Sequence, residues 1–279
     1  MNEASSRRNL VLAVLLAALG YFVDIYDLIL FSIVRVPSLK DIGVPPEKLL
    51  DTGLLLINMQ MGGMLVGGLL WGILGDKKGR LSVLFGSIAL YSLANLANGF
   101  VWTIPAYAAL RLIAGIGLAG ELGAGITLVS ELMSKETRGY GTMIVAGVGI
   151  MGGVAAGLVG DYFGWRNAYF VGGVMGLALL TLRIGVLESG IFAKVRDSAV
   201  LRGDFFMLLR TKENLRKYAS CILLGVPIWF VIGILATFAP EFGKALSMPV
   251  LPTGGRAVMW FYGGCALGDF ASGALSQYL

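Results

Sequence analysis

Long apolar runs alternate with short polar segments along the chain. The run over residues 54–74 is apolar apart from Asn58 and Gln60, and the run over 81–101 carries no charge. Runs of about 18 or more apolar residues are long enough to cross a bilayer as helices. The pattern predicts eight membrane spans. They cover residues 10–34, 54–74, 81–101, 104–133, 142–162, 168–186, 218–240 and 257–279.

Composition supports an all-α membrane protein. Of the 279 residues, 57% are hydrophobic and only 14% are charged, which is more apolar than a soluble domain requires. The 41 glycines suit close packing between membrane helices. The formal charge of +5 comes from basic residues between the apolar runs, so membrane topology accounts for it and nucleic-acid binding is not indicated.

The basic residues also predict how the chain is oriented. Most Lys and Arg fall on one side of the predicted spans, and that side includes Arg7 and Arg8 near the N-terminus. The excess of positive charge places this side in the cytoplasm. We expect a retained first helix, a cytoplasmic N-terminus, and residence in the plasma membrane, which is the inner membrane of a bacterial cell.

The segment between spans 2 and 3 reads Gly72-Ile-Leu-Gly-Asp76-Lys77-Lys-Gly79-Arg80. It resembles the signature loop between helices 2 and 3 of the major facilitator superfamily of secondary transporters. Every defined position of that pattern matches except the last basic one, where Leu81 stands. An ordinary cytoplasmic loop would explain the basic residues, but not Asp76 and the glycines. The resemblance covers about residues 10–190 well and implies a proton gradient as energy source, with no cofactor.

The longest polar stretch divides the chain. We expect a six-helix bundle over residues 1–187, a cytoplasmic linker over 188–217, and the first two helices of a second bundle over 218–279. Glycines of span 2 recur with the same spacing in span 8. These are Gly62, Gly63, Gly67 and Gly72 against Gly263, Gly264, Gly268 and Gly273. Transporters of this superfamily repeat a six-helix unit, so the chain is expected to be incomplete relative to twelve helices.

Three acids inside the spans are the predicted proton carriers. Asp24 and Asp27 lie three residues apart on one face of span 1, and Glu121 lies in span 4. Ionisable side chains are costly in a bilayer, so they indicate function. The chain has no histidine, and two close carboxylates do not both ionise easily, which suits one of them to hold a proton. The alternative is that one of the pair only accepts hydrogen bonds from neighbouring helices.

Arg111 is the predicted substrate-binding cation. The stretch Arg111-Leu-Ile-Ala-Gly-Ile-Gly117 resembles the superfamily pattern Arg-x-x-x-Gly-x-Gly, whose arginine faces the span 1 aspartate in proton-coupled symporters. A buried guanidinium stays charged and needs a carboxylate partner, so protonation of Asp24 or Asp27 would release it for an anion. Other candidate substrate contacts are Glu121, Tyr26, Asn58 and Gln60, of which the last three suit packing equally well.

Four charged residues at the cytoplasmic side are candidates for a gate. Asp76 and Arg80 flank the signature segment, and Glu131 and Arg138 lie at the cytoplasmic end of span 4. A network among them would hold the inner side closed. Solvated surface ion pairs, which contribute little, would give the same sequence pattern.

These features together imply a proton-coupled symporter that moves a small polar or anionic metabolite by alternating access. An organic anion, a phosphate or a sugar is the expected substrate, the lipid bilayer is the surrounding partner, and the protein is expected to be monomeric. The alternatives are an antiporter that exports drugs or metabolites, and a membrane scaffold or sensor that transports nothing. No catalytic motif, nucleotide-binding loop or Cys/His metal cluster indicates an enzyme, a primary pump or a metal site.

Overall fold

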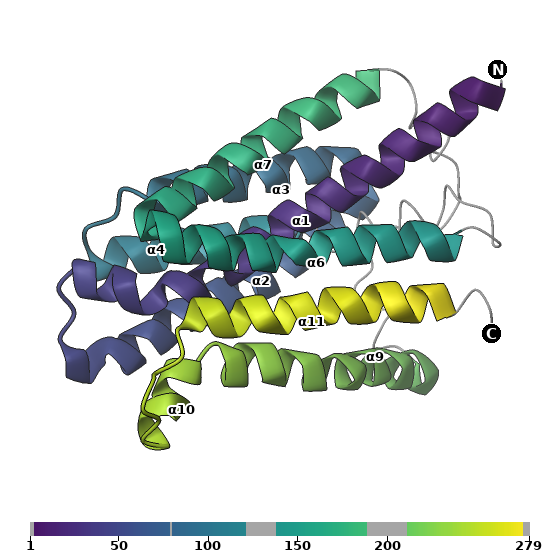
Figure 1. Ribbon diagram of the computed structural model, residues 1–279. Coiled ribbons are helices and arrows are strands. Elements are labelled where there is room, and N and C mark those ends of the chain that lie inside the picture. Colours follow the sequence, from purple (N-terminus) through teal and green to yellow (C-terminus); the bar gives the residue numbers. More distant parts are fainter. Residues whose placement is uncertain (1–2, 79, 121–137, 189–210, 276–279) are drawn as a thin grey trace.

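The computed structural model describes residues 3–78, 80–120, 138–188 and 211–275, which form helices packed side by side (Figure 1). The helices are α1 (Glu3–Asp41), α2 (Leu49–Lys78), α3 (Arg80–Asn98), α4 (Ile104–Leu118), α6 (Arg138–Phe163), α7 (Trp165–Glu188), α9 (Lys212–Phe230), α10 (Ala239–Ala245) and α11 (Gly254–Leu275). A short 3-10 turn, η1 (Pro46–Lys48), precedes α2. A π-helical turn, η3 (Val231–Ala236), follows α9.

Five of these helices are long and apolar enough to cross a membrane. Large apolar side chains also lie on the surface, such as Leu65 and Leu224, which are 72% and 81% exposed. Such a surface suits contact with lipid, where helices satisfy their own backbone hydrogen bonds. The fold is therefore that of an all-helical membrane protein, as the hydrophobic pattern predicts.

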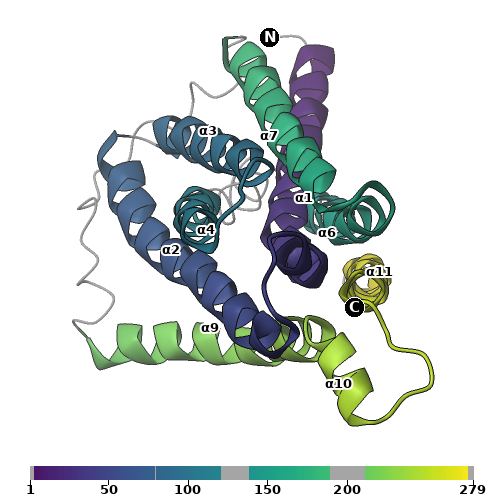
Figure 2. The same cartoon turned by 90° about the vertical axis from the view of Figure 1, so that its left-hand side faces the viewer.

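Helix α1 is the central element of the bundle. It contacts α2, α4, α6, α7 and α11. Figure 2 shows α3 and α4 on one side of it and α6 and α11 on the other. Residues 23–35 of α1 are buried, with the exception of Ser32, which is partly exposed. The charged side chains in this stretch, Asp24, Asp27 and Arg35, are consequently enclosed by the neighbouring helices.

Glycines set the closest contact between α2 and α4. A Cβ on Gly63 or on Gly67 would overlap the backbone of α4, at Leu112 in the first case. Gly68 and Gly72, one position along the helix, have nothing within 4 Å of the place that a Cβ would take. Only one of the two glycine rows on α2 therefore serves helix packing within the described residues.

Several helix boundaries differ from those predicted. Helix α4 ends at Leu118, before a turn at 119–120, although the predicted span continued to 133. Helix α1 continues to Asp41, past Pro37, because its last turns are packed in the core. The charged segment 72–80, predicted as a link between spans, is largely helical, since α2 runs to Lys78 and α3 begins at Arg80. The differences at α1 and at the α2–α3 segment arise where polar residues extend a helix beyond its apolar run.

The predicted span over 218–240 is divided into several elements. Helix α9 begins earlier than predicted, inside the expected linker, because the Thr211 hydroxyl caps it by accepting a hydrogen bond from the amide of Asn214 at 3.2 Å. After α9 the backbone widens, and the amide of Thr237 donates to the carbonyl of Ile232, five residues back, at 3.2 Å. The helix then ends, and α10 begins a new one. The rest of the expected linker, 189–210, lies outside the described residues.

We refer to α1 to α7 as the first half and to α9 to α11 as the second half. Helix α11 packs along α6, where Gly147 lies against Phe270 and Gly153 against Tyr262. The turn η3 adds Ile232 to the hydrophobic core that surrounds α1. Helix α10 lies at the end of the bundle opposite the N-terminus, which we call the far end (Figure 1).

Candidate functional site

Both predicted proton carriers on α1 lie in the interior. Asp24 is 1% exposed and Asp27 is fully buried. Oδ1 of Asp27 packs so closely on Gly172 of α7 that a Cβ there would overlap it. Asp27 interacts electrostatically with the hydroxyl of Tyr169. Asp24 interacts electrostatically with Tyr21.

Arg111 of α4 is also fully buried. Its Nη1 donates to the hydroxyl of Tyr169 and its Nη2 to Oδ1 of Asn95, both at 3.3 Å. The guanidinium carbon lies 5.5 Å from the ring centroid of Phe31 and 5.3 Å from that of Tyr169. The Nε group has no acceptor among the described residues. The arginine is thus held by a phenol, an amide and two aromatic faces, and Nε is its one nitrogen without a hydrogen-bond partner among the described residues.

Tyr169 of α7 connects the arginine to the acid. Its hydroxyl accepts the hydrogen bond from Arg111 and also interacts electrostatically with Asp27. The structure therefore brings residues of α1, α4 and α7 around one buried phenol. Because the interior is poor in water, charges placed there interact more strongly than on a surface.

A line of hydroxyl groups runs from this phenol toward the far end. The hydroxyls of Tyr107 and Tyr169 are 2.7 Å apart. Tyr107 also donates to Oγ of Ser38 at 3.4 Å, and Ser38 donates to the carbonyl of Arg35 at 3.0 Å. We call Tyr169, Tyr107 and Ser38 the hydroxyl line.

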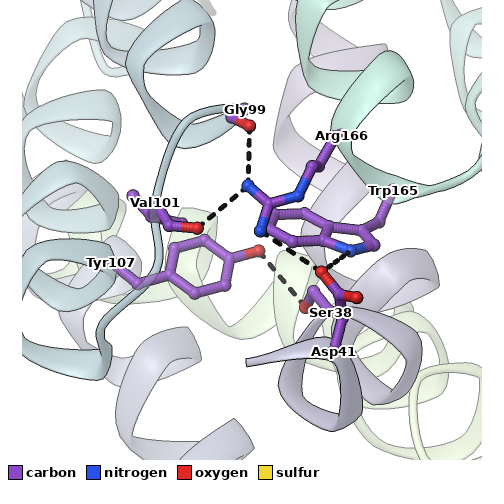
Figure 3. Close-up of polar contacts among 7 residues, drawn as sticks. All are labelled: Ser38, Asp41, Gly99, Val101, Tyr107, Trp165 and Arg166. Carbon is purple, nitrogen blue, oxygen red and sulfur yellow. Dashed lines mark hydrogen bonds and ion pairs between the residues drawn. The ribbon is translucent and has the colours of Figure 1, made fainter. Parts of the chain in front are cut away.

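A second polar cluster ties α1, α7 and the α3–α4 turn together at the far end (Figure 3). Arg166 donates to the carbonyls of Gly99 and Val101, each at 3.0 Å. It also pairs with Oδ2 of Asp41 at 3.2 Å, and the indole of Trp165 donates to the same oxygen at 3.2 Å. Since all its members belong to the first half, the cluster stiffens that half.

The remaining predicted substrate contacts differ in burial and in hydrogen bonding. The Tyr26 hydroxyl donates to the carbonyl of Ala168 at 2.9 Å, and its ring lies close to Gly172, beside Asp27. Gln60 is buried, and its amide donates to the carbonyl of Leu28 at 3.2 Å, so it joins α2 to α1. Asn58 is exposed and does not join the buried cluster.

Several predicted residues lie outside the part of the chain that can be described. These are Glu121 and Glu131, together with the side chains of Asp76, Arg80 and Arg138. The predicted inner gate and the predicted role of Glu121 therefore stay predictions.

The sequence reading missed Tyr169, Tyr107 and Asn95. Asn95 carries a signal that could have revealed it, because Ser92, Asn95 and Asn98 recur every three residues at the end of α3 and are all fully buried. The two tyrosines carry no such signal. Within the described residues, no group of three or more Cys, Asp or Glu side chains is arranged to hold a metal ion.

The chain is similar to a family model and to known transport proteins. A family model described as Major Facilitator Superfamily matches residues 9–279. The 3-(3-hydroxy-phenyl)propionate transporter of Escherichia coli (strain K12) is 37% identical over 156 residues, which are 52% of this chain and 39% of that protein. The niacin transporter NiaP of Acinetobacter baylyi (strain ATCC 33305 / BD413 / ADP1) is 29% identical over 175 residues, or 61% of this chain and 39% of that protein. The chain spans about half the length of the curated relatives it matches.

A solved structure shares the fold. The proton:xylose symporter XylE bound to 6-bromo-6-deoxy-D-glucose superposes with a TM-score of 0.65 at 16% identity. The match covers 98% of this chain and 69% of that one. At this identity the likeness establishes the arrangement of helices alone.

Proposed function

Because this chain belongs to the major facilitator superfamily, we propose that it is part of a proton-coupled secondary transporter that imports a small organic anion by alternating access. The fold and its membrane-length apolar helices make the chain an integral membrane protein. A transporter of this kind draws on an ion gradient and performs no covalent chemistry, so the proposal treats the protein as a carrier and not as an enzyme.

The observation that carries the proposal is the buried guanidinium of Arg111. A permanent positive charge inside a membrane protein costs free energy unless a group of opposite charge pairs with it. Its hydrogen bonds to Tyr169 and Asn95 go to neutral groups, and Nε has no acceptor among the described residues. A carboxylate on a substrate would supply the negative charge and the missing acceptor together.

The surroundings of Arg111 favour an aromatic carboxylate within this class. The rings of Phe31 and Tyr169 flank the guanidinium, and the ring of Tyr107 lies edge-on to both. Aromatic side chains pack well against a planar ring. The names of two relatives point the same way, because 3-(3-hydroxy-phenyl)propionate and niacin are both carboxylates attached to an aromatic ring system.

Asp27 is the proton carrier in this proposal. When Asp27 is ionised, its negative charge opposes the field that Arg111 exerts at Tyr169. Protonation of Asp27 removes that charge, so the guanidinium attracts an anion more strongly. The substrate and the proton then bind together and are released together, which is the requirement for symport.

The direction of transport follows from the orientation we propose. The distribution of Lys and Arg supports a cytoplasmic N-terminus, which would place the far end outside the cell. We place the protein in the bacterial inner membrane as a monomer. Uptake is then driven by protons that enter from the far end.

Uptake by the full-length protein in proteoliposomes tests the proposal. With an alkaline interior, we expect accumulation of 3-(3-hydroxyphenyl)propionate or nicotinate, and less of phosphate or xylose. Arg111→Gln should lower carboxylate uptake by about 10- to 100-fold, the range expected for lost hydrogen bonds to a charged group. Arg256→Gln removes an exposed arginine of α11 and should have no effect.

Equal uptake by Arg111→Gln and the parent would remove the basis of the proposal. Export of lipophilic cations in place of carboxylate uptake would establish the antiporter instead. Absence of any gradient-driven flux, in protein that is folded, would favour a scaffold or sensor.

A further inference from the structure

Arg35 is a second buried arginine on α1, and the transport mechanism above does not use it. It is 1% exposed, although it lies only six residues before the end of the helix. Its side chain is fixed on the α2 side, because a Cβ on Gly53 would lie 2.7 Å from its Cδ. The first half therefore presents a cation with little freedom of movement at the far end.

The groups that hold this guanidinium come from the second half. Oε1 of Glu241 in α10 lies 2.5 Å from Nη2 of Arg35. The carbonyl of Thr237 accepts from the same nitrogen at 3.5 Å, and the ring of Phe238 lies 4.7 Å from the guanidinium carbon. One short segment after the π-helical turn thus supplies a carboxylate, a carbonyl and an aromatic face.

The π-helical turn explains how that segment reaches Arg35. Thr237 turns both its amide and its hydroxyl to the carbonyl of Ile232, at 3.2 Å and 2.8 Å. This ends the helix, and Pro240 starts α10 in a new direction. Irregular turns of this kind inside membrane helices are often places where a helix bends during function.

We propose that Arg35 and Glu241 form a latch that holds the two halves together at the far end and must open before this end of the transport site becomes accessible. The Arg35 side chain is buried and that of Glu241 is 32% exposed, so the cost of desolvating the arginine offsets much of the attraction and the pair is weak support for stability alone. Such a pair suits a contact that forms in one state and breaks in another, since its two members belong to parts that separate.

The latch is also connected to the transport site. The hydroxyl line ends where Ser38 donates to the carbonyl of Arg35. Its other end is Tyr169, the partner of Arg111. The latch and the substrate-binding arginine are therefore joined through two tyrosines and a serine.

Thiol labelling in detergent tests the latch without depending on substrate or on membrane orientation. Ala236→Cys, in a background with Cys221→Ser and Cys265→Ser, supplies a reporter in η3 that is 8% exposed and belongs to the hydrophobic core that surrounds α1. Glu241→Gln should raise the rate of maleimide labelling about tenfold, the change produced by a loss of about 1.4 kcal/mol from the closed state. Glu213→Gln is the matched control, because Glu213 pairs with Lys217 within α9 and crosses no interface.

A second variant separates opening from misfolding. Arg35→Met with Glu241→Met removes both charges and leaves apolar side chains, a change that folded proteins often tolerate. We expect this double variant to keep the thermal midpoint of the parent and to be labelled faster than the Glu213→Gln control but more slowly than Glu241→Gln, which leaves the buried Arg35 unpaired. Labelling of both variants at the rate of the Glu213→Gln control would overturn the latch. Fast labelling together with no carboxylate uptake by the parent would keep the latch and reject the proposed substrate.

Discussion

The guanidinium of Arg111 and the phenol of Tyr169 meet at 3.3 Å in the interior of the bundle. The same phenol interacts electrostatically with Asp27 and lies 2.7 Å from the hydroxyl of Tyr107. The carboxyl group of Asp27 in α1 and the guanidinium of Arg111 in α4 therefore both interact with the same side chain of α7. A change in the charge of Asp27 therefore alters the electrostatic field at the phenol that Arg111 contacts.

Removing the hydroxyl of Tyr169 should weaken the connection between Asp27 and Arg111. Tyr169→Phe keeps the ring beside Arg111 but deprives both Arg111 and Tyr107 of a hydrogen-bond partner. We expect carboxylate uptake to fall about tenfold and the free energy of unfolding to fall by about 1 to 2 kcal/mol. Initial uptake rates and thermal unfolding in detergent measure these changes. Tyr162→Phe, at a position that is 81% exposed, is the control, and uptake by Tyr169→Phe at the control rate would exclude the linking role.

The sequence predicted the charged members of this site but not the group between them. Asp27 and Arg111 are conspicuous because ionisable residues are rare inside apolar runs. Tyr169 is one aromatic residue in an apolar run, and its partner Arg111 is 58 positions away. Its role depends on how α4 and α7 face each other, which no local pattern reveals. Gln60 shows the opposite situation. The sequence marked it as a candidate substrate contact, but its side-chain amide joins α2 to α1 through a backbone carbonyl.

The glycines of α2 give a test of the packing. A Cβ at Gly63 would overlap the carbonyl of Leu112, whereas Gly68 has open space beside it. Gly63→Ala should therefore lower the free energy of unfolding by about 1 to 3 kcal/mol, as overpacking does. Gly68→Ala, the matched control, should change it by less than about 0.5 kcal/mol. Thermal unfolding in detergent distinguishes them, and equal midpoints would contradict the observed contact between α2 and α4.

The helices themselves were predictable because a bilayer demands long apolar segments. Helix ends were less predictable, since α1 extends to Asp41 and α2 to Lys78 through polar residues that no apolar run marks. The division of the seventh span had one visible cause in Pro240, in the first turn of α10, whereas α9 continues past Pro227 to Phe230. The π-helical turn between them depends on how Thr237 bonds to the backbone, which composition does not specify.

Arg166 offers a test of the rigid far end of the first half. Its guanidinium lies 3.8 Å from the ring centroid of Trp102 and 4.1 Å from that of Trp165, in addition to its bonds to two carbonyls and Asp41. Lysine cannot replace this planar fork. Arg166→Lys should reduce the free energy of unfolding by about 1 to 3 kcal/mol.

Chemical denaturation of detergent-solubilised protein measures that loss. Arg256→Lys changes an arginine whose side chain is exposed, so it should leave stability unchanged. If Arg166→Lys and Arg256→Lys unfold at the same denaturant concentration, the cluster at the far end does not stabilise the first half.

Proton coupling through Asp27 is the central claim, and paired flux measurements on Asp27→Asn test it most directly. Asparagine keeps the size of the side chain against Gly172 but cannot carry a proton. In proteoliposomes, we predict that this variant loses accumulation of an aromatic carboxylate driven by the pH gradient and keeps exchange of labelled for unlabelled substrate. Asp51→Asn, an exposed acid on α2, should keep both activities. Accumulation by Asp27→Asn to the level of the parent would contradict the account.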